Sequence, residues 1–261
     1  MSKQTAPIGV FDSGVGGIST LRTLAQALPN ENFIFYGDSA NAPYGEKSSE
    51  QVCVLASQVL DQLKHHQVKA VVIACNTATS AAKQQLMVAN PDLPILGIEP
   101  ALKQAVDAGR HHILVMATPL TISLPKYQAQ VAKFQATTQI YSLPCPGLAD
   151  TIELGHAGLP QIQALIDQLM ADVKTQPIDA VVLGCTHYPF AADLIAAEFD
   201  HPVQIYTGYE GLAKNLVRHL TDQDLLRTAP NADRQIDFYS SRNTPEELAL
   251  YRHLYRYGLD Q

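Results

Sequence analysis

Short apolar runs alternate with longer segments of helical periodicity along most of the chain. The runs are rich in Val, Ile and Phe, and they predict strands at 8–11, 33–36, 70–74, 95–98 and 113–116. Between them, apolar residues recur with a period of about 3.6, most clearly in the predicted helix 48–65. This alternation predicts an α/β fold, in which parallel sheets are covered by helices on both faces.

One valine-rich run occurs twice, each time with a cysteine at its end. Residues 70–75 read Ala-Val-Val-Ile-Ala-Cys, and residues 180–185, 110 positions later, read Ala-Val-Val-Leu-Gly-Cys. The segments downstream, 92–95 and 200–203, also resemble each other. The repeat predicts two similar α/β domains, each with a cysteine at the carboxyl end of a buried strand. Ligands of open α/β sheets bind at such strand ends.

The tail of the chain differs from the rest. From about Gly211 onward it has helical character, and the segment 245–257 carries apolar residues at helical spacing. We expect this tail to be helical and to pack back on one of the two domains.

Composition and charge narrow the class of protein. The chain has 261 residues, enough for one large or two small domains. Its formal net charge of −7 argues against a broad basic surface for nucleic acid or anionic membrane. No apolar run approaches the roughly 18 residues of a membrane span, and the first residues lack the apolar stretch of an export signal. We therefore expect a cytoplasmic protein with no nucleic-acid substrate and no membrane partner.

The four cysteines divide into two kinds. In the cytoplasm they are expected as free thiols, and no Cys-x-x-Cys pair indicates a metal site. Cys53 and Cys145 are expected to have packing roles. Cys75 and Cys185, which the repeat relates, are each followed by hydrogen-bonding residues. We predict that these two form a paired thiol site.

Other strand ends also carry candidate binding residues. The turn 12–17, Asp-Ser-Gly-Val-Gly-Gly, fits neither a phosphate-binding loop nor a dinucleotide fingerprint. The loop 36–45 follows the second predicted strand. After Cys75, the side chains of Asn76 and Thr77 stand beside the free N–H groups of a helix start, a combination that suits a carboxylate.

Two facing thiols permit more than one chemistry. A thiol has a reference pKa of about 8.5, so it can act as a base when ionised and as an acid when protonated. One thiol on each face of a carbon centre would invert that centre by proton transfer. A nucleophilic cysteine with His187 as its base is an alternative, although it gives no role to the second cysteine. A redox pair is another, although such pairs usually lie close in sequence.

Taken together, the motifs resemble those of bacterial glutamate racemases, in the cofactor-independent aspartate/glutamate racemase superfamily. They run from residue 8 to about residue 190 in the order found in the family. The matching segments are 8–17, 36–38, 43–45, 75–78, Cys145-Pro146 with Glu153, and 183–189.

The resemblance implies roles for particular residues. Cys75 would act on D-glutamate and Cys185 on L-glutamate, with Asp12 and His187 assisting them. No cofactor is implied. The implied substrate-binding residues are Asp12, Ser13, Tyr44, Gly45, Asn76, Thr77, Thr186 and His187.

Expectations also attach to a few further positions. Asp38 and Glu153 are expected to support the residues that contact the substrate or to have structural roles. The resemblance implies that Thr118 and Thr121 add to the pocket for the side-chain carboxylate of the substrate. Ala117, just before Thr118, stands where the family has a glycine, which alters details of that pocket but not the chemistry.

The resemblance also implies an architecture and a cellular role. Residues 1–97 with 207–261 would form the first domain and 98–206 the second, with the active site in the cleft between them. The enzyme would be a homodimer that supplies D-glutamate for peptidoglycan, and hence for cell-wall biogenesis and cell shape. Two alternatives stay open: a racemase of the same fold for another acidic amino acid such as aspartate, and a non-catalytic regulator that binds a protein.

Overall fold

The structure is a computed structural model that describes residues 3–257. The described chain divides into two compact units. The first takes in the residues up to Ile98 and those from Tyr209 onward, and the second runs from Glu99 to Gly208. Within residues 3–257, no helix combines the length and the apolar character that a membrane span requires.

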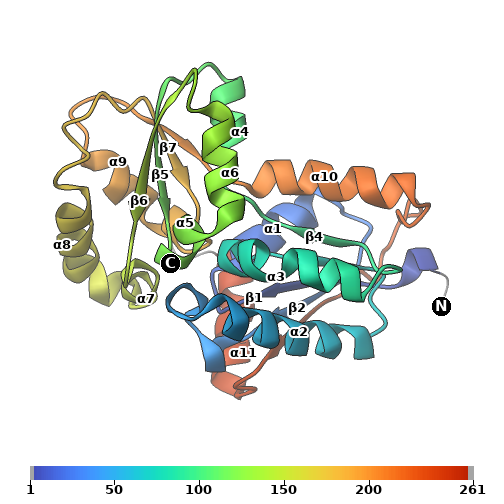
Figure 1. Ribbon diagram of the computed structural model, residues 1–261. Coiled ribbons are helices and arrows are strands. Elements are labelled where there is room, and N and C mark those ends of the chain that lie inside the picture. Colours follow the sequence, from blue (N-terminus) through green and yellow to red (C-terminus); the bar gives the residue numbers. More distant parts are fainter. Residues whose placement is uncertain (1–2, 258–261) are drawn as a thin grey trace. The chain divides into compact units, whose positions relative to one another are not determined.

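The first unit is built on a sheet of five parallel strands, in the order β4-β3-β1-β2-β9 (Figure 1). The strands are β1 (Ile8–Asp12), β2 (Phe33–Gly37), β3 (Ala70–Ile73), β4 (Ile95–Gly97) and β9 (Ile236–Ser240). Every residue of β1 and β3 is buried. These central strands lie between helices on both faces, which explains their continuous apolar runs.

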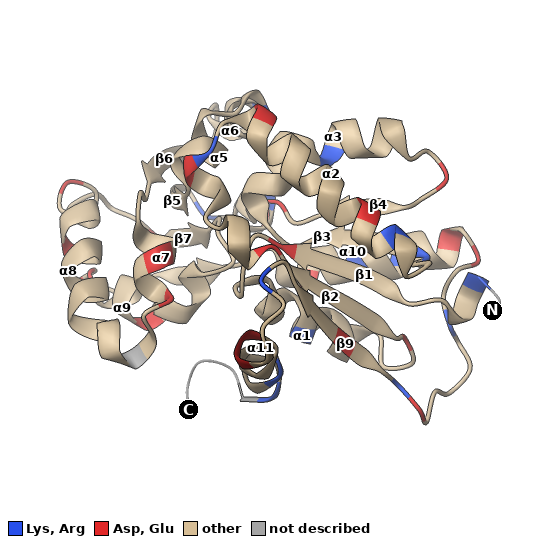
Figure 2. Ribbon diagram, turned by 90° about the horizontal axis from the view of Figure 1, so that it is seen from below, with Lys and Arg blue, Asp and Glu red and all other residues tan. Residues whose placement is uncertain are grey.

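Helices cover both faces of this sheet. They are α1 (Gly17–Ala27), α2 (Ser49–His65), α3 (Asn76–Ala89), α10 (Tyr209–Asp222) and α11 (Pro245–Tyr257). In β1, Ile8 and Val10 share a core with α1, α10 and α11. Gly9 points the other way, where a Cβ would lie 3.0 Å from Leu63 of α2. Figure 2 shows α2 and α3 on one side of the sheet and α1 and α11 on the other.

The expectation of a wholly helical tail was wrong at β9. Residues 236–240 form a parallel strand beside β2, with Ile236 opposite Phe33. This edge strand pairs with β2 alone, and only Phe238 and Ser240 of it are buried. An edge strand needs no continuous apolar run, so its composition gave a weak signal.

The second unit has a sheet of four parallel strands, in the order β6-β5-β7-β8. The strands are β5 (His112–Ala117), β6 (Gln139–Pro144), β7 (Ala180–Leu183) and β8 (Gln204–Tyr206). Its helices are α4 (Leu102–Asp107), α5 (Pro119–Ser123), α6 (Pro125–Phe134), α7 (Leu148–Ile152), α8 (Leu159–Met170) and α9 (Ala192–Ala197). One face of the sheet packs on α4 and α6, and the other packs on α7, α8 and α9. The prediction of an α/β fold with helix-covered parallel sheets is confirmed in both units.

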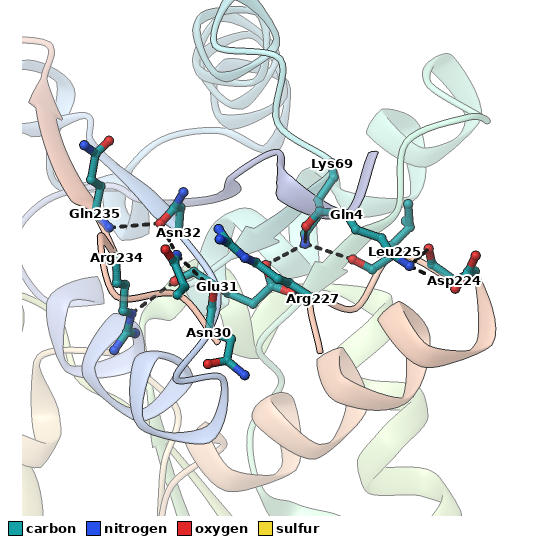
Figure 3. A network of polar contacts seen from close by, with 11 residues as sticks. Gln4, Asn30, Glu31, Asn32, Lys69, Asp224, Leu225, Arg227, Arg234 and Gln235 are labelled. Atoms are coloured by element: carbon teal, nitrogen blue, oxygen red, sulfur yellow. Dashed lines mark hydrogen bonds and ion pairs between the residues drawn. The ribbon is translucent and has the colours of Figure 1, made fainter. Parts of the chain in front are cut away.

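A polar network fixes the amino edge of the first sheet (Figure 3). The Lys69 and Glu31 side chains, each 1% exposed, form an ion pair of 2.5 Å. The Lys69 ammonium also donates to the carbonyl oxygens of Gln4 at 2.6 Å and Leu225 at 2.8 Å. The other Glu31 oxygen accepts the backbone N–H of Arg227 at 2.8 Å. The network therefore joins the start of the chain, the β1–β2 connection and the segment after α10.

Candidate active site

The first unit gathers one group of predicted site residues at the carboxyl edge of its sheet. β1, β2 and β3 are neighbours, and each is followed by one of the predicted stretches. Because parallel strands end at the same edge, the turn after Asp12, the loop 38–45 and the segment 75–77 meet there.

Cys75 occupies the N-cap position of α3. It is buried, and its sulfur accepts the backbone N–H of Ala78 at 3.4 Å. A helix N-terminus stabilises negative charge, so this position favours a thiolate. Asn76 and Thr77 follow as the first residues of the helix, and both are buried. Among the described residues, Asn76 Oδ1 has no hydrogen-bond partner, so a buried acceptor is available beside Cys75.

Asp12 ends β1 and is fully buried. Its Oδ2 accepts the backbone N–H of Gly14 at 3.1 Å, which holds the turn against the carboxylate. A Cβ on Gly17 would lie 2.4 Å from the Cβ of Asp12. The glycine at the start of α1 therefore allows this helix to pack directly on Asp12. Ser13, the next residue, is also buried.

The loop 38–45 is tied together by Asp38. Tyr44 is buried and donates its hydroxyl to Asp38 Oδ2 at 2.5 Å, while Asn41 donates to Oδ1 at 2.9 Å. Burial, the hydrogen bond to Asp38 and the nearby charges of Asp38, Cys75 and Asp12 raise the pKa of Tyr44 far above its usual value. The phenol therefore stays protonated and can serve as a hydrogen-bond donor. Gly45 follows it in the same buried turn.

The second unit gathers the other group around Cys185. This cysteine lies two residues beyond β7, as Cys75 lies two residues beyond β3. Its sulfur is 3.8 Å from Nδ1 of His187, whose Nε2 lies 2.8 Å from Oε1 of Glu153. Cys185 and His187 are buried, whereas the Glu153 side chain is 38% exposed. The result is a row of thiol, imidazole and carboxylate that reaches from the core to solvent.

The electrostatics of this row favour an imidazolium. Burial alone would lower the pKa of His187, but hydrogen bonds to Cys185 and Glu153 and their charges raise it well above its usual value. A protonated imidazole next to a thiol stabilises the thiolate. The two cysteines are thus supported differently, Cys75 by a helix N-terminus and Cys185 by a charged histidine.

The remaining residues near Cys185 are also buried. Thr186 lies between Cys185 and His187 in sequence. Thr118 begins α5 at the end of the neighbouring strand β5, and its hydroxyl accepts the backbone N–H of Thr121 at 3.3 Å. Cys145 shares the core with Cys185, and burial followed by the Cys185 charge raises its pKa to about 12. That thiol stays protonated.

Glu153 reaches His187 from a distant part of the sequence. It lies 34 residues before His187, at the end of α7, so only the folding of the second unit brings the two together. In the sequence, Glu153 stands out only as part of the motif that it forms with Cys145-Pro146. Among residues 3–257, no group of three or more His, Cys, Asp and Glu side chains is arranged to hold a metal ion.

Comparisons with known proteins find a family of racemases. The profile of the family described as Asp/Glu/Hydantoin racemase matches residues 8–214. A glutamate racemase of Clostridium novyi is 41% identical over 249 residues, which cover 95% of this chain and 96% of the relative.

Two solved structures extend the similarity to three dimensions. A glutamate racemase isoform of Bacillus anthracis superposes with a TM-score of 0.87 at 28% identity, covering 97% of this chain and 94% of the other. A glutamate racemase of Francisella tularensis in complex with D-glutamate gives a TM-score of 0.82 at 30% identity, with the same coverages of 97% and 94%.

Proposed function

This chain belongs to the Asp/Glu/hydantoin racemase family, and on that premise we propose that it interconverts L- and D-glutamate without a cofactor. The named relatives support glutamate as the substrate, because they are glutamate racemases and one of them is in complex with D-glutamate. One structural observation carries the proposal. Each unit places a buried cysteine two residues beyond an equivalent strand, beside a group that stabilises its thiolate.

The proposed reaction moves one proton off the α-carbon and another onto its opposite face. For L-glutamate, the Cys185 thiolate forms an S–H bond while the Cα–H bond breaks, and the electron pair is delocalised into the α-carboxylate. The Cys75 thiol then gives its proton to the α-carbon from the other side and becomes a thiolate. For D-glutamate the two cysteines exchange roles. Proton exchange then restores the starting state of both thiols.

The neighbouring residues hold the substrate and its developing charge. Asn76 and Thr77 begin α3 and would bind a carboxylate together with the free helix N–H groups. The unpartnered Oδ1 of Asn76 suits the substrate ammonium. Asp12 would accept a proton or contact the ammonium, and Tyr44 would donate a hydrogen bond. The remaining proposed contacts are Ser13, Gly45, Thr186 and His187.

In the row of thiol, imidazole and carboxylate in the second unit, we propose a positioning role for Glu153. Its carboxylate fixes the orientation of the His187 ring through Nε2 and supports the charge of the imidazolium. His187 then presents Nδ1 to the sulfur of Cys185. This arrangement supports an acid/base role for Cys185 at neutral pH.

The family membership also supports a wider proposal. We infer that the two units are two domains, of residues 1–97 with 207–261 and of 98–206. We further propose a cytoplasmic homodimer whose D-glutamate enters peptidoglycan. Growth rescue of a bacterium that requires D-glutamate and sedimentation equilibrium of the purified protein test these two statements.

Isotope exchange tests the proposed activity directly. The purified protein is incubated in D2O with L- or D-glutamate and no added cofactor, and optical rotation and Cα deuteration are followed. We expect loss of rotation and deuterium at Cα from either enantiomer. If neither enantiomer exchanges or inverts, the proposal fails. Activity on aspartate alone would identify the alternative racemase, and protein binding without any exchange would favour the regulator.

Serine substitutions test the two-base scheme. Cys75→Ser and Cys185→Ser replace each thiol with a hydroxyl that is a far weaker base, so each should lower inversion by roughly 10²–10⁴-fold. The matched control is Cys53→Ser, because Cys53 is a half-buried thiol on α2 that donates to the carbonyl oxygen of Ala81. This control should keep its activity. Full inversion by either test variant would exclude the two-base scheme.

A further inference from the structure

A buried tyrosine of the last helix packs against the base of the loop 38–45. Tyr251 of α11 is 0% exposed, and its ring meets that of Phe35 edge to face, with centroids 5.4 Å apart. A Cβ on Gly37 would lie 2.0 Å from the Tyr251 hydroxyl oxygen. The phenol thus occupies the space beside the last residue of β2, where the loop departs from the sheet.

The hydroxyl of Tyr251 is shared among several partners. It lies 2.7 Å from Ser39 Oγ and 3.1 Å from Glu247 Oε1, and it is also hydrogen-bonded to Ser240. A phenol has one proton and a carboxylate can only accept, so Tyr251 donates to Glu247 and accepts from Ser39. Burial and the Glu247 charge raise the pKa of Tyr251 above its usual value despite the two serine hydrogen bonds. The phenol therefore remains protonated, and its hydrogen bonds to Ser39 and Glu247 persist across the physiological pH range.

The contact with Ser39 leads toward the proposed substrate residues. Ser39 follows Asp38, whose carboxylate accepts the hydroxyl of Tyr44. Tyr44 in turn lies within the electrostatic reach of Cys75 and Asp12. A second link reinforces the first, because the backbone N–H of Ala40 donates to Ser241 Oγ at 2.9 Å. The segment from β9 to α11 thus holds the first turn of the loop by two hydrogen bonds.

We propose that Tyr251 is a positioning residue for substrate binding, whose hydroxyl fixes Ser39 and so holds the loop 38–45 in its binding geometry before glutamate arrives. The inference rests on the proposed function, because it assigns the loop to glutamate. A preformed loop lowers the ordering cost of binding. Removal of the hydroxyl therefore weakens binding of both enantiomers and leaves proton transfer by the cysteines in place.

The test compares Tyr251→Phe with the wild-type enzyme in both reaction directions. Tyr251→Phe removes every hydrogen bond of the hydroxyl, but only the neutral one to Ser39 holds the loop. Its loss predicts a rise of about 3- to 10-fold in KM for each enantiomer. kcat should stay within about 2-fold, because the loop holds substrate and transfers no proton. A merely structural role gives another pattern, in which a smaller folded fraction lowers kcat and leaves KM unchanged.

Two further variants control for the helix and for the contact. Tyr255→Phe removes a hydroxyl from the same helix, at a half-buried residue that packs on Phe238, and its KM should not change. Ser39→Ala removes the other end of the contact and should raise KM as Tyr251→Phe does. Because both substitutions break one shared hydrogen bond, the double variant should raise KM no further than the larger single effect. Independent, multiplying effects would overturn the proposal.

Amide hydrogen exchange of the unliganded protein separates this inference from the proposed function. Tyr251→Phe should speed exchange in residues 38–45 and leave the segment 75–89 unchanged. If the wild-type enzyme fails to racemise glutamate, the proposed function falls, whereas the exchange result still reports on the loop. Unchanged exchange in the variant, or faster exchange with an unchanged KM, overturns the positioning role of Tyr251.

Discussion

At the scale of single residues, the two cysteines differ in the group beside them that can stabilise a thiolate. A Cys75 thiolate would be stabilised by the backbone N–H groups at the start of α3, and these groups do not titrate. Cys185 relies on His187, whose charge in turn depends on Glu153. The two halves should therefore respond differently to pH and to substitution.

Glu153→Gln should shift the pH dependence of racemisation. Loss of the carboxylate charge removes one cause of the raised pKa of His187. The imidazolium then deprotonates at lower pH, so activity on the alkaline side should be lost at lower pH than in the wild type. Loss of a charged hydrogen bond predicts a decrease of roughly 10-fold or more in kcat/KM near pH 8. Rates recorded by circular dichroism from pH 6 to pH 10 measure the shift.

Asp200→Asn provides the matched control for that experiment. Asp200 also pairs with an imidazole of the second unit, His201, at 2.7 Å, but it is almost fully exposed. Its replacement should change neither kcat/KM nor the profile. An unshifted profile in Glu153→Gln would contradict the role of the carboxylate in supporting His187.

The sequence predicted those residues of the candidate site that lie at strand ends. Cys75 and Cys185 follow buried valine-rich strands, and that pattern is local in sequence. Glu153 and Tyr251 carry no such local signal, because their polar contacts join residues that are 34 and 212 positions apart. Such contacts depend on which helices pack together, and periodicity alone does not specify that.

At the scale of elements, the buried pair of Lys69 and Glu31 joins three separate segments of the first unit. Lys69→Met would leave the Glu31 carboxylate buried without its charge partner. We expect this substitution to lower the free energy of unfolding by about 3–5 kcal/mol. Urea unfolding followed by circular dichroism measures the change.

The control for this prediction is an exposed ion pair. Lys103 and Asp107 lie one helical turn apart on α4, with side chains that are 64% and 58% exposed. Lys103→Met should cost no more than about 0.5 kcal/mol. In the double variant Lys69→Met/Glu31→Met, part of the lost stability should return, because no unpaired charge remains. Equal stabilities of Lys69→Met and Lys103→Met would contradict this account.

Helices and strands also differed in how clearly the sequence predicted them. The predicted helix 48–65 corresponds to α2, since Ser48 and Gln51 form a capping box that fixes its start. β9 was not predicted, because an edge strand with alternating polar residues resembles the helical segments around it. Strong local signals therefore belong to central strands and capped helices.

At the scale of the whole molecule, an acidic chain is proposed to bind an acidic substrate. The net charge is −7, and acidic and basic residues are interspersed along the ribbon of each unit (Figure 2). Binding would thus rely on donors at the site rather than on long-range attraction. Raising the concentration of potassium chloride from about 0.05 to 0.3 M should change kcat/KM by less than about 2-fold. A steep decrease with salt would indicate electrostatic steering instead.

The path of the chain through its two units has a consequence for biosynthesis. The second unit is continuous in sequence, whereas the first needs α10, β9 and α11 from the end of the chain to cover Phe33, Phe35 and their neighbours. A ribosome adds roughly 5–20 residues per second. The inserted unit can therefore fold while synthesis continues, but the unit that begins the chain must wait with an open apolar face until the last helix emerges. Nascent chains of this protein should accordingly depend on chaperones until translation ends.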